Sequence, residues 1–369
     1  MTDTAPAAAT GRVADSRYAW ARLAVIQTGA IAMVAFLAGD YASEIFRLGP
    51  LSSSLYAALF IVFLTAVNIA GIRQGKVTQM LLAAGILFGL LVVSAAGILA
   101  DGPRAPVSSG GIVPGRQALG TAMIFVLLTY GGWNEASFLS AEVRQGPHNP
   151  LKVLLFSIGT VTAVYLLVNV ALLNSLGLSG MVSSKAVMAD MMRGLLGASA
   201  GAVVSLLILL AAVSTMNASI ITGARTGYAL GRDFPVLGIL GRWQGRRQTP
   251  VNALLVQGGV ALALVALGTG AHDGFVMMVE YSAPVFWLFF LMVGVSVFLL
   301  RRRYPDLPRP FRVPLYPLTP LVFIAICAFM LYASLAYTGR GSWVGVCVLL
   351  SGIPLWVWQK QRRTADKYS

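Results

Sequence analysis

The sequence predicts an all-α integral membrane protein with about ten transmembrane helices. Three observations support this prediction: 57% of the 369 residues are hydrophobic, only 11% are charged, and the apolar residues form long runs. Soluble chains carry about 25% charged residues, so the composition excludes an ordinary soluble enzyme and a disordered chain. A β-barrel would show short alternating strands instead of long runs, so helices are the expected spanning elements.

Each predicted span is a run of about 20 mostly apolar residues, the length that a helix needs to cross the hydrocarbon layer. The spans form one predicted transmembrane domain at 20–358, between a polar N-terminal segment at 1–19 and a basic tail at 359–369. The spans lie at 20–40, 51–71, 77–100, 117–136, 151–177, 198–222, 251–268, 274–300, 317–337 and 342–358.

The distribution of basic residues predicts the orientation of these spans. The chain has 27 Lys and Arg against 13 Asp and Glu, a net charge of +14. Most of the cations fall in alternate loops, on the side where both termini lie. The positive-inside rule makes this side cytoplasmic, so we expect a multi-pass protein of the cell (inner) membrane with both termini cytoplasmic. Membrane lipids are the expected partners of this charge, and nucleic acid is not, because the cations are not gathered on one polar face.

Three loops are long enough to hold structure of their own. The 101–116 loop is rich in Gly, Pro and Ser and predicts an irregular segment. The 223–249 loop mixes large apolar residues with Arg, which favours either an amphipathic helix at the membrane interface or a plain basic connector. The 301–316 loop carries four prolines after three arginines and predicts a stiff tether.

Motifs for catalysis, cofactors or metals are absent from the sequence. The chain has two histidines, no His–Glu pair at metal-ligand spacing, no phosphate-binding Gly-Lys-Ser/Thr loop and no nucleophile elbow. Cys327 and Cys347 lie inside apolar runs and read as small apolar side chains. We therefore expect no enzyme, no cofactor and no metal site.

The apolar pattern is broken most clearly in the fourth predicted span. Adjacent Gly131 and Gly132 disfavour a continuous helix and free backbone groups where lipid offers no partner. Such a break is tolerated where it lines a cavity, and it presents helix ends and backbone groups to a small charged ligand. The alternative is a glycine hinge beside an interfacial aromatic residue. The predicted substrate-binding residues are Leu128, Thr129, Tyr130, Gly131, Gly132, Trp133 and Asn134.

Other polar residues inside the spans are fewer. Thr215, Asn217 and Ser219 in the sixth span either line a polar path or ion site or take part in helix packing. Glu280 in the eighth span is a candidate for a carboxylate that titrates with transport, or it snorkels or pairs with a loop arginine. Three asparagines are expected to form interhelical hydrogen bonds: Asn68, Asn169 and Asn174.

The residues around the break resemble a known family. The stretch 130–134 (YGGWN), followed by 141–144 (AEVR), Asn149 and Pro150, is similar to the sixth helix and following loop of amino acid permeases. These belong to the amino acid–polyamine–organocation superfamily, and the resemblance is to its L-type neutral amino acid exchangers. Further similarities cover most of the chain, at 25–41, 222–237, 281–303 and 304–319.

The resemblance implies a fold of two inverted five-helix repeats plus two further helices, with the first and sixth helices broken. The ten spans match helices three to twelve of that fold, so the first two helices are expected to be missing from this chain. The resemblance also implies that carbonyl groups of the break, at about Thr129 to Gly132, receive the amino group of the substrate.

Two positions depart from the family pattern. The residue before the Thr-Tyr pair is commonly an aromatic gate in the family and is Leu128 here. Many members carry a lysine in the fifth helix, where this chain has Gly85. The expected function is secondary active transport of an amino acid by alternating access, as an antiporter or with cation or proton coupling. A neutral substrate is favoured because no buried acid lies beside the break. The alternative is a truncated, non-transporting remnant or a regulatory membrane partner.

Overall fold

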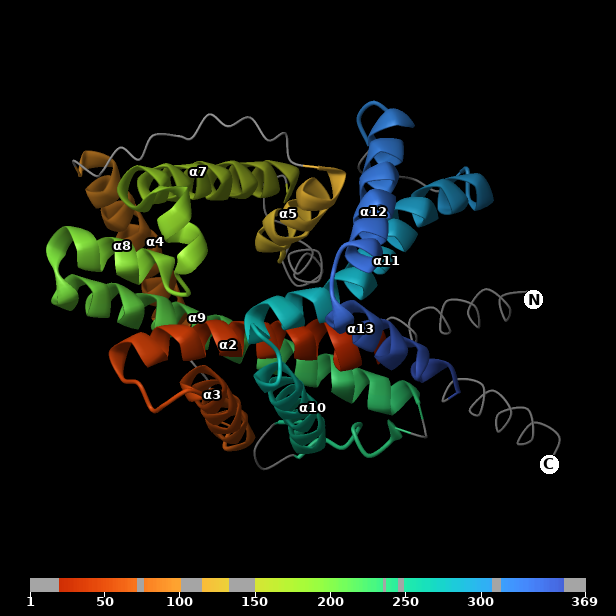
Figure 1. The fold of residues 1–369 in the computed structure, drawn as a ribbon. Helices are drawn as coiled ribbons and strands as arrows, with labels where there is room; N and C mark the ends of the chain where they lie inside the picture. Colours follow the sequence, from red (N-terminus) through yellow and green to blue (C-terminus); the bar gives the residue numbers. More distant parts are fainter. Residues whose placement is uncertain are drawn as a thin grey trace, which may run out of the picture.

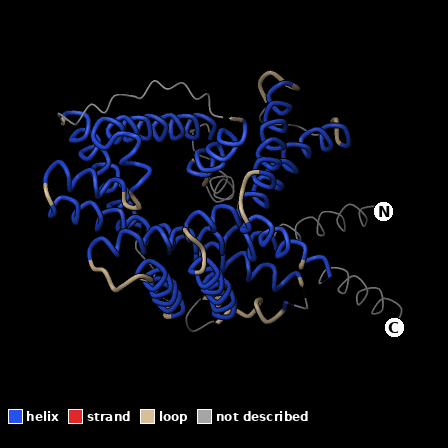
Figure 2. The backbone as a smooth tube through the Cα atoms, in the orientation of Figure 1, coloured by secondary structure: helices blue, strands red, loops and turns tan. Residues whose placement is uncertain are grey.

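A computed structural model confirms the all-α fold (Figures 1 and 2). The structure describes residues 20–71, 76–100, 115–132, 150–234, 237–244, 249–306 and 313–354. Within these ranges the chain is helical apart from short connections and one isolated bridge between Gln244 and Thr249. The predicted terminal segments 1–19 and 359–369 lie outside the described residues, as does most of the 101–116 loop.

A short π-helix begins the described chain and runs directly into the first long α-helix. The elements are η1 (Arg22–Gln27), α2 (Thr28–Ile45), α3 (Ser52–Ile69), α4 (Lys76–Leu99), α5 (Arg116–Thr129), α7 (Pro150–Ser183), α8 (Val187–Leu196), α9 (Ala198–Asp233), α10 (Val251–Thr269), α11 (Gly274–Arg303), α12 (Leu318–Ala336) and α13 (Arg340–Leu350).

Eight of these helices are long and apolar enough to cross a membrane, counting η1 and α2 as one. They correspond to eight of the ten predicted spans. The other two predicted spans, 117–136 and 342–358, are present as α5 with 14 residues and α13 with 11. The predicted remainder of both spans runs into residues that the structure does not describe.

Helix α9 is longer than predicted. It continues 11 residues past the predicted end at 222 and stops at Asp233, so the first part of the 223–249 loop is helical as a continuation of α9. The continuation is stabilised by packing: Leu230 is buried with Leu23 and Leu240. A Cβ atom on Gly231 would lie 2.2 Å from the backbone nitrogen of Gly241, so the chain turns back tightly against the end of α9.

Helix α8 was not predicted, because ten residues are too short for the span pattern. It is held to the end of α2 by Arg193, whose guanidinium lies 2.6 Å from both Glu44 and Asp190. The hydrogen bond that Arg193 donates to Glu44 raises the pKa of its guanidinium, so the arginine stays charged. The α11–α12 connection is similarly anchored, because the Arg301 guanidinium lies 3.8 Å from the centre of the Tyr316 ring.

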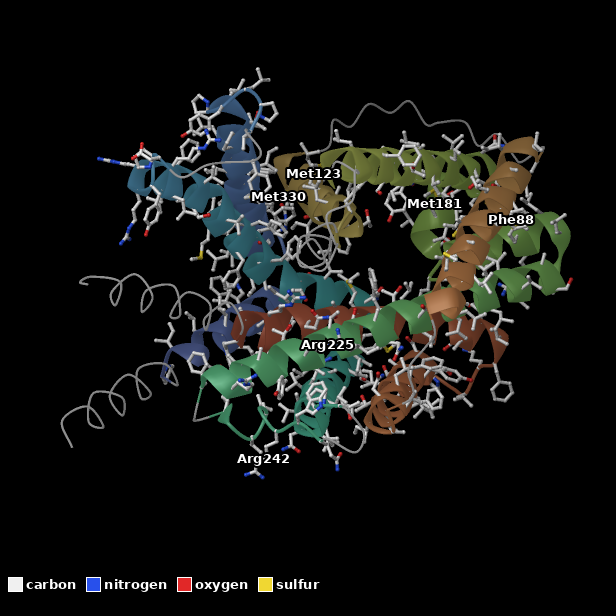
Figure 3. All side chains as sticks on the ribbon, turned by 180° about the vertical axis from the view of Figure 1, so that it is seen from behind. Phe88, Met123, Met181, Arg225, Arg242 and Met330 are labelled. Carbon is white, nitrogen blue, oxygen red and sulfur yellow. The ribbon has the colours of Figure 1, made fainter. Side chains whose placement is uncertain are left out.

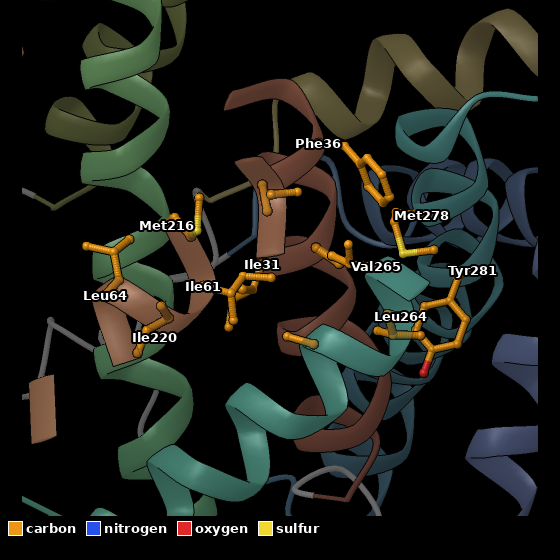
Figure 4. Packing of buried hydrophobic residues seen from close by; sticks show 14 of the residues in the cluster. Ile31, Phe36, Ile61, Leu64, Met216, Ile220, Leu264, Val265, Met278 and Tyr281 are labelled. Atoms are coloured by element: carbon orange, nitrogen blue, oxygen red, sulfur yellow. The ribbon is translucent and has the colours of Figure 1, made fainter. Parts of the chain in front are cut away.

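The centre of the molecule is α2, which packs against α3, α9, α10 and α11 (Figure 1). In the span formed by η1 and α2, 67% of the most apolar stretch of 18 residues is buried inside the molecule. The corresponding share is 17% in α4 and in α7. Small residues allow this density: a Cβ atom on Gly39 would lie 2.1 Å from the carbonyl oxygen of Ser53. The core around α2 includes Ile31, Ile61, Met216 and Val265 (Figure 4).

Two smaller clusters lie beside this bundle. One joins α4, α7, α8 and α9 through residues such as Val93 and Leu172. The other joins α5, α11 and α12, where Ile124 and Met330 are fully buried and Met123 packs at the edge (Figure 3). Helix α5 is therefore attached to the molecule mainly through α12 and α11.

The two ends of the described chain meet at α13. The indole nitrogen of Trp20 donates a hydrogen bond of 3.2 Å to the carbonyl of Val348. Helix α13 also approaches α11 very closely, since a Cβ atom on Gly345 would lie 2.0 Å from the carbonyl oxygen of Tyr281. A glycine at this position is what permits the contact.

We expect the substitution Gly345→Ala to destabilise the protein by about 1–3 kcal/mol, because the added methyl group forces α13 away from α11. The measurement is the thermal unfolding midpoint of the purified protein in detergent. The matched control is Gly85→Ala, where a Cβ atom would meet nothing within 4 Å and alanine is the better helix former. Equal midpoints for the two variants would contradict the packing argument.

Candidate functional site

The break predicted in the fourth span lies at the end of α5. The helix stops at Thr129, and the N–H of Gly131 donates to the carbonyl of Leu128 at 2.9 Å, which closes a tight turn. Gly132 has φ +102°, a conformation that side-chain-bearing residues rarely adopt. The helical pattern is therefore broken at the glycine pair. Trp133 and Asn134, the last two predicted site residues, lie outside the described residues.

The position of this break is consistent with a helix that ends inside the hydrocarbon layer. Helix α5 has 14 residues, or about 21 Å at 1.5 Å per residue, whereas the layer is about 30 Å thick. A helix end leaves its last carbonyl groups without helical partners. It also carries the negative end of the helix dipole.

Three of the last four carbonyl groups of α5 accept hydrogen bonds from groups outside the regular helical pattern. The carbonyl of Val126 accepts a hydrogen bond from the hydroxyl of Thr129 at 2.6 Å, and that of Leu128 accepts from Gly131. The carbonyl of Thr129 accepts from the hydroxyl of Tyr165 on α7 at 3.1 Å. The rings of Tyr130 and Tyr165 also meet edge to face, with centroids 5.3 Å apart.

The predicted site residues on α5 point in different directions. Leu128 packs with the α5–α11–α12 cluster, so its side chain belongs to the helix contact in this structure. Thr129, Gly131 and Gly132 are exposed, and Tyr130 is half-buried. Tyr165 was not predicted as a site residue. The signal for it was available, because an aromatic hydroxyl in an apolar span is itself an exception to the pattern.

Among the three polar residues predicted on α9, only the Asn217 side chain makes an interhelical hydrogen bond in the described chain. Asn217 is buried and accepts a hydrogen bond of 2.7 Å from the amide of Asn68 on α3, which confirms the interhelical bond expected for Asn68. The carbonyl of Ser219 accepts a hydrogen bond of 2.8 Å from Gln27, and Thr215 is exposed. Helix α5, which carries the break, packs on α12 and α11.

The other two asparagines behave differently from each other. Asn174 donates to carbonyls at the end of α4, including Gly97 at 3.0 Å, so the expected interhelical bond is confirmed. Asn169 donates to the carbonyl of Tyr165 in its own helix, so the expected interhelical bond is not found among the described residues.

Glu280 lies half-buried near the start of α11. Its carboxylate accepts a hydrogen bond of 2.9 Å from the N–H of Gly339, the residue that precedes α13. A carboxylate at a helix N-terminus is stabilised by the dipole of that helix. Within the described chain Glu280 therefore binds a helix end, and no salt bridge to an arginine is found. Its proposed part in coupling stays a prediction.

Groups of three or more His, Cys, Asp or Glu that could hold a metal ion are not found among the described residues. Cys327 and Cys347 are free thiols, and Gly85 on α4 is exposed with open space around it.

Eight helices that are long and apolar enough to cross a membrane are the arrangement of a multi-pass membrane protein. The sequence profile of the amino acid permease family matches residues 5–357, so this chain belongs to that family. The match covers nearly the whole described structure and confirms the resemblance seen in the break.

Several characterised relatives are amino acid transporters. The b(0,+)-type amino acid transporter 1 of Mus musculus is 26% identical over 346 residues, which are 91% of this chain and 69% of the relative. The cystine/glutamate transporter of Homo sapiens is 25% identical over 356 residues, 93% of this chain and 70% of the relative. The serine/threonine exchanger SteT of Bacillus subtilis (strain 168) is 24% identical over 352 residues, 94% of this chain and 78% of the relative.

The Asn68–Asn217 pair predicts a coupled effect on stability. Asn68→Leu leaves the buried Asn217 oxygen without its donor, and Asn217→Leu leaves the Asn68 amide with only the carbonyl of Leu64, so we expect each to cost about 1–3 kcal/mol. The double variant should cost less than the sum, because no amide is then left unpaired. Thermal unfolding of the four proteins measures this. The control Asn169→Leu removes an exposed amide bonded only to its own helix and should change little. Strict additivity would show that the two amides act independently.

Two substitutions of Glu280, which accepts the hydrogen bond from Gly339, distinguish a structural role of this carboxylate from a role in coupling. Glu280→Ala removes the group that binds the start of α13, and we expect a loss of about 0.5–2 kcal/mol of stability. Glu280→Gln keeps an acceptor oxygen and should lose less. If Glu280→Gln is as stable as the unmodified protein but no longer responds to an imposed proton gradient in an uptake assay, the carboxylate is part of the coupling machinery.

Proposed function

We propose that the protein is a secondary active transporter that moves an amino acid across the membrane by alternating access. The substrate binds where α5 ends. The observation that carries the proposal is the turn after Thr129, with Gly132 at φ +102°, in an otherwise apolar helix of an amino acid permease. The proposal includes a cell (inner) membrane location with both termini cytoplasmic, as the loop charges indicate.

The chemistry of the helix end suits the amino group of an amino acid. An ammonium group is a charged donor of three hydrogen bonds, and the C-terminal end of α5 offers carbonyl oxygens and the negative end of a dipole. The Tyr130 ring, together with Trp133 and Asn134, supplies an aromatic wall and an amide for the rest of the substrate.

The electrostatics favour a neutral side chain on the substrate. The described residues of α5 and its turn contain no Asp or Glu that could pair with a cationic side chain. The relatives have different names: serine/threonine exchanger, cystine/glutamate transporter and b(0,+)-type transporter. Membership of the family therefore does not by itself identify the substrate. Small and large neutral amino acids are therefore the first substrates to test.

The test is uptake of each of the twenty radiolabelled L-amino acids into proteoliposomes that contain the purified protein. We expect uptake of at least one neutral amino acid above that of protein-free liposomes. Gly132→Ala forces a side chain into a strained conformation, at about 1–3 kcal/mol, and should lower uptake by about 5- to 150-fold.

The matched control is Gly159→Ala on α7, an exposed helical glycine with nothing within 4 Å of a Cβ atom. It should transport like the unmodified protein. Full uptake by Gly132→Ala would place the substrate elsewhere. No uptake by the unmodified protein, with or without amino acid loaded inside, would favour the non-transporting remnant or regulatory partner.

A further inference from the structure

The carbonyl group of Thr129, which the proposed function offers to the substrate, already has a partner. The hydroxyl of Tyr165 donates a hydrogen bond to it at 3.1 Å, from a helix 36 residues further along the chain. Figure 1 shows α5 near α7, and the contact comes from the middle of α7, which runs from Pro150 to Ser183. The same tyrosine ring meets Tyr130 edge to face, with an interplanar angle of 71°. One side chain of α7 thus contacts the turn through both its ring and its hydroxyl.

Tyr165 lies on a polar strip of an otherwise apolar helix. Thr162, Tyr165 and Asn169 follow the i, i+3, i+7 spacing of one helix face. Asn169 is exposed, and Thr162 and Tyr165 are partly exposed. An exposed amide is unfavourable against lipid hydrocarbon. Thr162 and Asn169 donate to carbonyl groups of their own helix, whereas the Tyr165 hydroxyl reaches out of α7 to the carbonyl of Thr129.

We propose that the Tyr165 hydroxyl occupies the Thr129 carbonyl when no amino acid is bound, and that the ammonium group of the amino acid displaces it. This inference rests on the proposed function and adds a residue that controls binding. In the unoccupied site, the hydroxyl spares the carbonyl from being left unpaired in an apolar environment. On binding, a neutral donor is exchanged for a charged one, and charge-assisted hydrogen bonds are roughly twice as strong.

The exchange makes Tyr165 a determinant of affinity, while the carbonyl of Thr129 provides the preference for a charged amino group. Every ligand must replace the hydrogen bond of the hydroxyl, so the affinity of all ligands is lowered by the same factor. A ligand with a charged amino group recovers this loss, whereas an analogue with a neutral amide or hydroxyl in its place does not. The site then selects free amino acids over their N-acetylated and hydroxy-acid analogues.

The test is the variant Tyr165→Phe, which removes the hydroxyl and keeps the ring against Tyr130. The probe is the L-amino acid, of the twenty, that most stabilises the unmodified protein against heat. Without the competing hydroxyl, we expect the dissociation constant of this probe to fall by about 2- to 12-fold, the value of one net hydrogen bond. The unliganded variant should also unfold at a lower temperature than the unmodified protein.

The matched control is Tyr332→Phe on α12. Tyr332 also meets a tyrosine ring edge to face, that of Tyr337 at 5.6 Å, and its hydroxyl makes no hydrogen bond to another described residue. This variant should bind the probe like the unmodified protein. A merely structural Tyr165 would predict weaker binding by Tyr165→Phe, which is the opposite direction.

The outcomes separate this inference from the proposed function. If no amino acid stabilises the unmodified protein, both are overturned. If the unmodified protein is stabilised and Tyr165→Phe binds the probe equally or less tightly, only the role of Tyr165 is overturned. Tighter binding by Tyr165→Phe together with unchanged binding by Tyr332→Phe supports the exchange.

A second measurement covers the case in which Tyr165→Phe does not fold. 3-Fluorotyrosine is placed at position 165, or at position 332 as the control, and its fluorine resonance is followed while the same probe is added. The exchange predicts a shift at position 165 that saturates with the probe and no such shift at position 332. An unmoved resonance at position 165 under saturating probe overturns the inference.

Discussion

The last carbonyl groups of a helix have no partners within that helix and must find them elsewhere, and this constraint organises the end of α5. At the end of α5 the partners come from three sources: the Thr129 hydroxyl, the backbone of Gly131 and the phenol of Tyr165. The first two are local and hold the turn. The third comes from another helix, so it ties the position of α7 to the shape of the break. The glycine pair makes the turn sterically accessible, and the partners make it stable in lipid.

The same helix end lies at the loosely packed side of the molecule. The bundle around α2 is dense, because glycines such as Gly39 allow the helix backbones to approach closely. In the span formed by η1 and α2, 67% of the most apolar stretch of 18 residues is buried. In helix α7 only 17% of the most apolar stretch of 18 residues is buried, and α5 is attached to the molecule mainly through α12. Within the described chain α5 and α7 are therefore less enclosed by other helices than α2 is.

The sequence predicts what depends on local composition and misses what depends on contacts. Length and hydropathy define the spans. The low helix propensity of Gly131 and Gly132 predicts the break, because this effect is local to the residues themselves. The extension of α9 to Asp233 depends on Leu230 packing against Leu23, which is distant in the chain. Helix α8 depends on Arg193 reaching Glu44 of another helix. These pairings are tertiary, so no window of the sequence contains them.

Polar residues in the spans illustrate the same limit, because the residue type alone does not separate packing from binding. Asn217 is deeply buried and bonded to Asn68, and Glu280 binds the start of α13, so both have partners that keep helices together. The phenol of Tyr165 differs in one respect: its partner is a carbonyl group at a helix end, beside exposed glycines. A neutral donor on such a carbonyl is a bond that a charged ligand can replace with a stronger one. Asn174 also donates to carbonyl groups at a helix end, that of α4, so the proposed binding role of Tyr165 depends on where its partner lies, beside the glycine pair, and only the folded chain shows this placement.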